Sequence, residues 1–251
     1  MAGRLLSSLH EYGLLDLAQY GFVVDGSCVE PLTLMARLFE SGRGPDGEEV
    51  HVVCLDATSA FDSVPHTALD AALRRLGAPS DFIAWMRAML SGHRRVAATA
   101  YEVDGDGEAE MLEGGCPQGC PSSPAIGVIV VDYALSVLRQ WDGGGVRVGD
   151  KVLRCLAFAD DMALAAHTKE EVREATQTLV AAMGAIGVRF NARKSYYTWS
   201  GAAARAAGRE PTELPVEPLA VNALDADGRW REMALTSVPP RGTPDGETLE
   251  E

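Results

Sequence analysis

Two adjacent carboxylates, Asp160 and Asp161, interrupt an otherwise apolar stretch, VLRCLAFADDMALAA, at residues 152–166. The runs on either side predict the two buried strands of a hairpin, with the aspartates at its tip. An Asp-Asp pair in a turn is usually solvated, but these flanking strands are expected to hold the turn rigidly at the end of a core sheet. Two like charges fixed close together repel each other, and a divalent cation is the usual remedy.

A third carboxylate, Asp56, ends the other buried strand that the sequence predicts, VHVVCLDA at residues 50–57. If the two strands are neighbours, Asp56, Asp160 and Asp161 converge at one edge of the sheet. Ligands that are all oxygen favour Mg²⁺ or Mn²⁺. Two such ions activate an attacking hydroxyl and stabilise a leaving phosphate oxygen in an in-line displacement. This pattern alone fits polymerases, nucleotide cyclases and some nucleases equally well.

Between these strands in sequence lies GGCPQGCPSSPAIG, at residues 114–127. Its Pro-Gln-Gly turn offers a side-chain amide and flexible backbone, and the following Ser-Ser-Pro predicts the start of a helix with free N–H groups. Such groups can hold the sugar, base or phosphate of a nucleotide. Taken alone, the stretch favours a structural loop with an ordinary helix cap.

Helix and strand signals alternate along the rest of the chain. Apolar residues at helical spacing predict helices within residues 30–40, 65–77, 79–92, 122–141 and 168–187. Ser80 and Ser123 are the expected N-caps of two of these helices, and Thr168 with Glu171 forms a capping box. A hairpin is expected between residues 95 and 115. From residue 201 onward the chain is rich in Ala, Gly, Pro and Glu, and its last residues read as a disordered tail.

Composition narrows the class of protein. The 251 residues are 47% hydrophobic and carry a formal net charge of −14, which argues against indiscriminate nucleic-acid binding by the whole surface. No apolar run is long enough to span a membrane, and the first residues lack the pattern of a secretory signal. The five cysteines show no metal-binding spacing and are expected to be free thiols. These features predict a soluble, intracellular protein.

Five segments in order resemble the reverse transcriptase family, and most closely its LINE-like, non-LTR retrotransposon branch. QYGFVVDGSCVEPL (residues 19–32) is similar to that branch's Q-x-GF segment, and LDATSAFDSVPHTAL (55–69) to polymerase motif A. GCPQGCPSSP (115–124) resembles motif B, FADDMAL (158–164) motif C, and GVRFNARKS (187–195) motif D. Each motif is weak singly, but five in sequence are highly specific.

The resemblance implies roles for the acidic and basic residues. Asp56 and Asp160 would ligate two Mg²⁺ or Mn²⁺ ions, with Asp161 as the second aspartate of the pair. Lys194 matches a lysine that protonates the departing pyrophosphate; a plain surface lysine is the alternative.

The resemblance also implies a set of nucleotide-binding residues. Ala57 would contribute backbone near the triphosphate, and Gln118 and Gly119 would contact the incoming nucleotide. Phe61 stands where the family places an aromatic gate against a ribose 2′-hydroxyl, although a core aromatic at a strand-to-helix corner fits as well. Phe158 replaces the commoner Tyr and keeps an aromatic plane beside the primer.

The fold expected from the resemblance is α+β: a right-hand polymerase palm, built as a ferredoxin-like antiparallel sheet with helices packed on one face, plus partial fingers and no thumb. Residues 1–200 would form this palm with partial fingers. Residues 201–251 would hold a truncated primer-grip region, whose hairpin begins near LDADGRWREM (224–233), and the acidic tail.

The expected function is RNA-directed DNA synthesis, with an RNA template, a DNA primer and dNTPs as partners. A retroelement origin is compatible with activity in the nucleus. An alternative is an inactive retroelement remnant that at most binds RNA or a partner. A cyclase-like enzyme is disfavoured, because it has no need for the Pro-Gln-Gly and Ser-Ser-Pro segment between its carboxylate strands.

Overall fold

The computed structural model describes residues 2–23, 26–42, 47–58, 64–91, 94–95, 110–111, 115–116, 121–149, 151–206, 217–224 and 229–238. Its helices are α1 (Ala2–Glu11), α2 (Val29–Ser41), α4 (His66–Arg75), α5 (Ser80–Leu90), α6 (Ser123–Gln140), α7 (Lys169–Ala185) and α8 (Ala202–Ala206). Its strands are β1 (His51–Leu55), β2 (Ala57–Thr58), β3 (Arg94–Arg95), β4 (Glu110–Met111), β5 (Val146–Val148), β6 (Lys151–Leu153), β7 (Cys155–Phe158), β8 (Asp161–Ala166), β9 (Arg189–Phe190), β10 (Tyr196–Trp199), β11 (Leu219–Leu224) and β12 (Trp230–Ser237).

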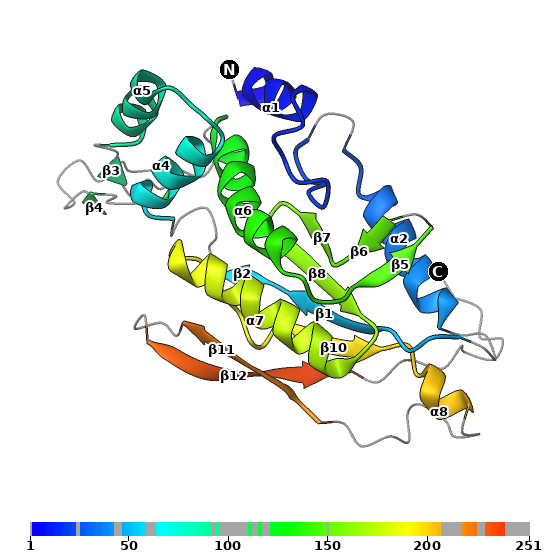
Figure 1. Ribbon diagram of the computed structural model, residues 1–251. Helices are drawn as coiled ribbons and strands as arrows, with labels where there is room; N and C mark the ends of the chain where they lie inside the picture. Colours follow the sequence, from blue (N-terminus) through cyan, green and yellow to red (C-terminus); the bar gives the residue numbers. More distant parts are fainter. Residues whose placement is uncertain are drawn as a thin grey trace, which may run out of the picture.

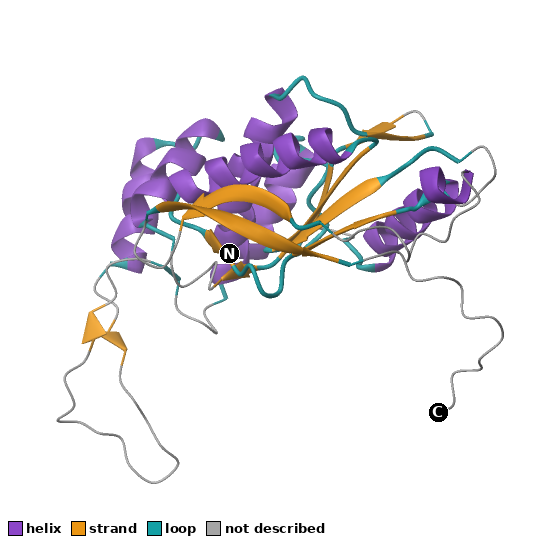
Figure 2. Ribbon diagram, turned by 90° about the horizontal axis from the view of Figure 1, so that it is seen from below, coloured by secondary structure: helices purple, strands orange, loops and turns teal. Residues whose placement is uncertain are grey.

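The centre of the fold is a six-stranded sheet in the order β11-β12-β10-β1-β8-β7 (Figure 1). The four strands β10, β1, β8 and β7 pair antiparallel, as the sequence predicts. At the other edge β12 pairs parallel with β10, so the sheet is mixed rather than wholly antiparallel. The parallel pair follows from the path of the chain. Strand β11 runs opposite to β10, and the chain then turns back into β12, which therefore runs in the same direction as β10. Figure 2 views the sheet from the β11–β12 side.

The central strand β1 is buried on both of its faces. Val53 and Leu55 belong to the large core that α6 and α7 cover, whereas Val52 packs in a second cluster with Leu38 of α2. The expectation of helices on one face is therefore wrong for α2, which covers the opposite face. A continuous apolar strand such as this one needs cover on both sides.

Helices α6 and α7 lie side by side over the main face of the sheet (Figure 1). Most of α6 is buried, as its near-continuous apolar sequence predicts. It begins at Ser123 with Ser122 as N-cap, one residue earlier than expected, and α5 likewise begins at Ser80. The capping box of α7 is present: Thr168 Oγ1 accepts from the Glu171 N–H, and the Glu171 carboxylate accepts from the Thr168 N–H.

The short strands β3 and β4 pair antiparallel at the base of the hairpin expected between residues 95 and 115, most of which lies outside the described residues. In the part of the chain that the structure describes, no helix combines the length and the apolar character that crossing a membrane requires.

Candidate active site

The FADD segment forms the tight hairpin that its apolar flanks predict. Phe158 at the end of β7 pairs with Asp161 at the start of β8, so Ala159 and Asp160 alone make the turn. Ala159 has a φ of 59°, in the left-handed region that residues with a side chain rarely adopt. The first position of such a two-residue turn is usually Gly when φ is positive there. The two aspartates are thus presented by a strained turn at the end of a buried sheet.

Asp56 reaches the same edge from the neighbouring strand. Leu55 pairs with Met162 across β1 and β8, so the next residue, Asp56, lies opposite Asp161. The pKa of Asp161 is raised by burial and by the charges of Asp160 and Asp56, and Lys194 opposes that rise. The strand register therefore places Asp56 at the same edge of the sheet as the aspartate pair.

The motif D loop brings Lys194 to this edge. Its Nζ lies 3.8 Å from Asp56 Oδ1. The loop is shaped by Asn191, whose carbonyl accepts from the backbone N–H of Lys194 at 3.1 Å and of Ser195 at 2.9 Å. In return the loop holds Asp56. The Asp56 N–H donates to Ser195 Oγ at 3.0 Å, and the Asp56 carbonyl accepts from the Asn191 N–H at 2.8 Å. A reciprocal set of bonds fixes the backbone of this loop beside Asp56.

These carboxylates suit a hard divalent cation in two respects. Their donors are oxygens alone, and burial, followed by the charges of Asp160 and Asp56, raises the pKa of Asp161, so a nearby cation would favour its ionised form. Among the described residues, however, no group of three or more His, Cys, Asp or Glu side chains meets closely enough to hold one ion. The donor chemistry fits a metal, whereas a three-ligand shell is not preformed.

A cavity of about 470 Å³ opens beside the carboxylates, between α2 and the sheet. Asp56, Asp161 and Lys194 stand in its wall together with two exposed aromatic rings, Phe158 and Tyr196. Most of the remaining lining is apolar and comes from α2, β1, β7 and β8: Pro31, Leu32, Met35, Leu55, Leu156, Ala157, Met162 and Ala163. The site is therefore a charged rim above an apolar groove, with Phe158 exposed in the wall beside Asp161.

Tyr196 is held by a neighbour on β1. A hydrogen bond with the Cys54 side chain, together with the charge of that thiol, raises the pKa of Tyr196 to about 12. Burial in turn raises the pKa of the Cys54 thiol. Both groups stay neutral at physiological pH, so they add no charge to the lining of the groove beside the aspartates.

The other predicted site residues divide into two groups. Ala57 lies in β2, directly after Asp56, and pairs with Phe190 of β9. Phe61, Gln118 and Gly119 lie outside the described residues.

One residue that the sequence reasoning did not assign, Gln19, contacts the aspartate turn. Its buried side chain hydrogen bonds to both the N–H and the carbonyl of Ala159. No local sequence pattern signals this contact, because the two residues are 140 positions apart. The only hint was the position of Gln19 at the head of the segment QYGF.

The comparisons with known proteins agree with this geometry. The family profile described as Reverse transcriptase (RNA-dependent DNA polymerase) matches residues 3–219. The chain is 27% identical over 197 residues to the Pol polyprotein of the type-2 retrotransposable element R2DM of Drosophila melanogaster, covering 78% of this chain and 18% of that protein. It is 30% identical over 184 residues to the Pol polyprotein of an R2 element of Popillia japonica, covering 72% and 25%. The chain thus spans about a fifth to a quarter of the length of these relatives.

Solved structures show the same fold. Telomerase from Candida tropicalis, in complex with a TWJ fragment of telomeric RNA, matches with a TM-score of 0.59 and 11% identity, over 86% of this chain and 35% of that one. Apo telomerase from the same organism, truncated from its C-terminal domain, matches with a TM-score of 0.56 and 12% identity, over 78% and 39%. The α+β polymerase palm predicted from sequence is confirmed, and with the R2 relatives so is the non-LTR branch. The chain belongs to the reverse transcriptase (RNA-dependent DNA polymerase) family.

Proposed function

We propose that this chain catalyses RNA-directed DNA synthesis at the edge formed by Asp56 and the FADD turn. The 3′-oxygen of a DNA primer forms a bond to the α-phosphorus of a dNTP, and the bond from that phosphorus to the bridging oxygen of the pyrophosphate breaks. The observation that carries the proposal is the convergence of Asp56 and Asp161 on the wall of one cavity, with Asp160 beside them and Lys194 3.8 Å from Asp56.

The carboxylates have a clear part in this chemistry. Reverse transcriptases generally use divalent metal ions, and in this chain Asp56, Asp160 and Asp161 would hold two Mg²⁺ or Mn²⁺. Bound there, the ions would supply positive charge at the attacking and leaving oxygens. Because β1 and the β7–β8 hairpin are packed in the core, the backbone that carries the carboxylates is held in place before substrate arrives.

Lys194 is proposed to serve the leaving group. In the structure its ammonium lies beside Asp56 on an exposed loop, so it can turn toward a triphosphate that approaches the same edge. It would donate a proton to the pyrophosphate oxygen freed by the reaction. The proton of the primer hydroxyl would pass to solvent.

The nucleotide-binding roles follow the family pattern. Ala57 would offer its backbone to the triphosphate, and Phe158, which is exposed beside Asp161, would contact the primer end. Phe61, Gln118 and Gly119 are proposed to contact the incoming nucleotide.

The domain assignment is part of the same proposal. Residues 1–200 would form the palm with part of the fingers, and residues 201–251 the primer-grip region and tail. The hairpin of β11 and β12 supports the second assignment, because it extends the palm sheet beyond β10. Telomerase with RNA shares the fold, which is consistent with a groove that accepts an RNA template.

Primer extension tests the proposal. The purified chain is given an RNA template, a DNA primer, dNTPs and Mg²⁺ or Mn²⁺, beside the Asp160→Asn, Asp161→Asn double variant. A matched control is Asp81→Asn, which neutralises an exposed aspartate in the first turn of α5. We expect extension by the wild type and the control, and none by the double variant. A folded wild type that does not extend would favour the inactive remnant.

A further inference from the structure

The segment at residues 18–20 lies along the outer edge of the FADD hairpin. The Ala157 N–H donates to the Ala18 carbonyl at 2.7 Å, and the Tyr20 N–H donates to the Ala157 carbonyl at 2.7 Å. These bonds make Gln19 a parallel bridge partner of Ala157 on β7. The edge of the palm sheet nearest the aspartates is therefore covered by chain from well upstream in the sequence.

The Gln19 side chain points into this junction and is almost fully buried, with 4% exposed. Its Oε1 accepts from the N–H of Ala159 at 3.0 Å and from the N–H of Gly21 at 2.8 Å. Its Nε2 donates to the Ala159 carbonyl at 3.3 Å. One side chain thus bonds both polar backbone groups of the residue directly before Asp160.

Ala159 is the residue of the turn that needs such support. Its φ of 59° is strained for a residue with a Cβ, so an unsupported turn would relax toward other backbone conformations. Relaxation at Ala159 would move Asp160 and Asp161, since both follow it immediately. The bonds from Gln19 oppose that movement without touching either carboxylate.

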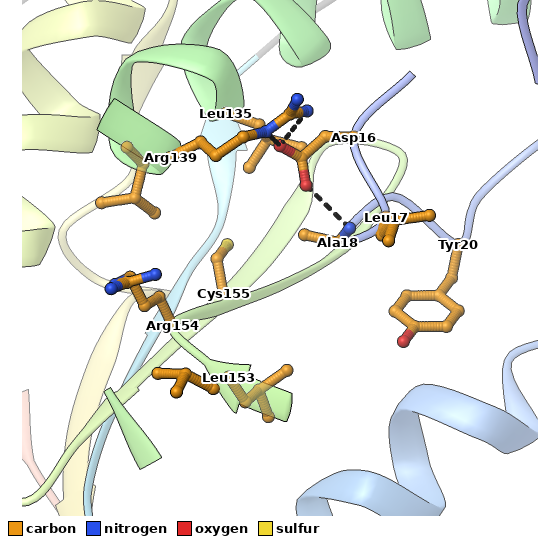
Figure 3. A pocket seen from close by; sticks show the side chains of 11 residues that line it. Asp16, Leu17, Ala18, Tyr20, Leu135, Arg139, Leu153, Arg154 and Cys155 are labelled. Carbon is orange, nitrogen blue, oxygen red and sulfur yellow. Dashed lines mark hydrogen bonds and ion pairs between the residues drawn. The ribbon is translucent and has the colours of Figure 1, made fainter. Parts of the chain in front are cut away.

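The segment that carries Gln19 is itself anchored. Asp16 forms an ion pair with Arg139 of α6, and its Oδ1 accepts from the Ala18 N–H at 2.9 Å, as Figure 3 shows at the wall of a cavity of about 340 Å³. The Asp16 N–H donates to Asp132, which is fully buried in α6 and paired with Arg75 of α4. The clamp is therefore tied to the helical layer that covers the main face of the sheet.

We infer that Gln19 is a positioning residue for the polymerase reaction: it holds the strained peptide of Ala159 so that the FADD carboxylates stay in register with Asp56. This inference rests on the proposed function. It predicts that loss of the Gln19 amide slows nucleotide addition while the dNTP and the template-primer still bind.

The test compares single-nucleotide addition by the full chain, its Gln19→Ala variant and its Gln19→Glu variant, which can accept but cannot donate to Ala159. The control is Glu49→Ala, which removes three hydrogen bonds to Ser200, Gly201 and Ala203 at the opposite end of β1. We expect kcat of Gln19→Ala to fall on the order of tenfold to a hundredfold, because a misplacement of about 1 Å in groups that position a reaction can cost roughly a hundredfold in rate. KM for dNTP should change less than threefold, and kcat of the control should stay near that of the wild type.

A second-site variant separates positioning from simple loss of stability. Ala159→Gly removes the strain at positive φ, so adding it to Gln19→Ala should recover at least part of kcat. Equal loss of kcat in Gln19→Ala and Glu49→Ala, or a Gln19→Ala variant within twofold of the wild type, would overturn the inference.

Hydrogen exchange distinguishes failure of this inference from failure of the proposed function. The Ala159 amide should be protected in the wild type and should exchange faster in Gln19→Ala. A folded wild type that does not add nucleotides would refute the proposed function, and with it the catalytic purpose of the clamp, even where Ala159 is protected. An active wild type with an unprotected Ala159 amide would refute the clamp alone.

Discussion

Replacing Gly21 with Ala should disturb the aspartate turn directly. A Cβ at this position would lie 2.2 Å from the Ala159 nitrogen, 2.9 Å from the Phe158 carbonyl carbon and 3.0 Å from the Ala159 Cα. All three atoms are backbone, so no flexible side chain can move aside. Real Cβ atoms essentially never approach closer than 3.0 Å, so widening the shortest contact from 2.2 Å requires a displacement of about 0.8 Å. The turn and the Gln19 segment must therefore separate.

Two effects follow from that displacement. Overpacking of this kind costs about 1–3 kcal/mol of the free energy of unfolding. A shift near 1 Å in groups that position a reaction lowers its rate by roughly a hundredfold. Gly21→Ala should thus lose more activity than its loss of stability explains, because the strain falls on the residue that precedes Asp160.

Urea denaturation and primer extension measure the two effects separately. Gly3→Ala is the matched control, because a Cβ at Gly3 of α1 meets nothing within 4 Å and Ala favours a helix. The control should keep full activity and at least the stability of the wild type. A Gly21→Ala variant with the urea midpoint and extension rate of the wild type would refute the close packing of the two segments.

Three further outcomes follow from other parts of the structure. Ala159→Gly should change the free energy of unfolding by less than about 1 kcal/mol, because relief of strain at positive φ is offset by the greater freedom of Gly in the unfolded chain. Strong destabilisation of this variant in urea denaturation would contradict this. Asp132→Ala should destabilise the fold by about 3 kcal/mol, because it leaves Arg75 without its buried partner; an unchanged urea midpoint would show that the pair is unimportant. His51 stacks on Tyr197 and hydrogen bonds to its hydroxyl, and burial, the main cause, lowers the pKa of its imidazole below the 6.5 of the free side chain. Below about pH 6.5 the unfolded chain therefore binds a proton at this residue that the folded chain does not, so the free energy of unfolding should fall as the pH drops. The fall is at most about 1.4 kcal/mol per pH unit and ends at the pKa of the folded state. Urea denaturation at pH 7.5 and 5.5 should show a smaller fall for His51→Gln, and equal falls in both proteins would contradict the assignment.

The parts of the site that depend on local pattern could be predicted from sequence. Apolar runs on both sides of FADD predict the hairpin, and the similar run before Asp56 predicts a second buried strand. Their pairing through Leu55 and Met162 places Asp56 opposite Asp161, as expected, although the described side chains form no preformed three-ligand site. The loop that carries Lys194 follows from the motif D resemblance, although its distance to Asp56 does not.

The parts that depend on distant contacts could not be predicted. Periodicity shows that α2 has an apolar stripe but not which face of the sheet it covers. The positive φ of Ala159 has no signature in an alanine, and its clamp, Gln19, is 140 positions away. The strands β11 and β12 were expected only as the start of a hairpin near residue 224, because the Ala- and Pro-rich chain before them masks the alternating pattern LAVNAL.

Single-nucleotide addition by the wild type and Asp56→Asn tests the central claim most directly. This substitution removes one charge from the edge and keeps the size of the side chain, so the fold should persist while catalysis does not. On an RNA template with a DNA primer and Mg²⁺, the wild type should add the complementary dNTP and release one pyrophosphate for each nucleotide added. The variant should be slower by roughly a hundredfold to a thousandfold, the usual cost of losing one preorganised electrostatic group. Equal rates in the two folded proteins, or no addition by either, would contradict polymerase chemistry at this edge of the sheet.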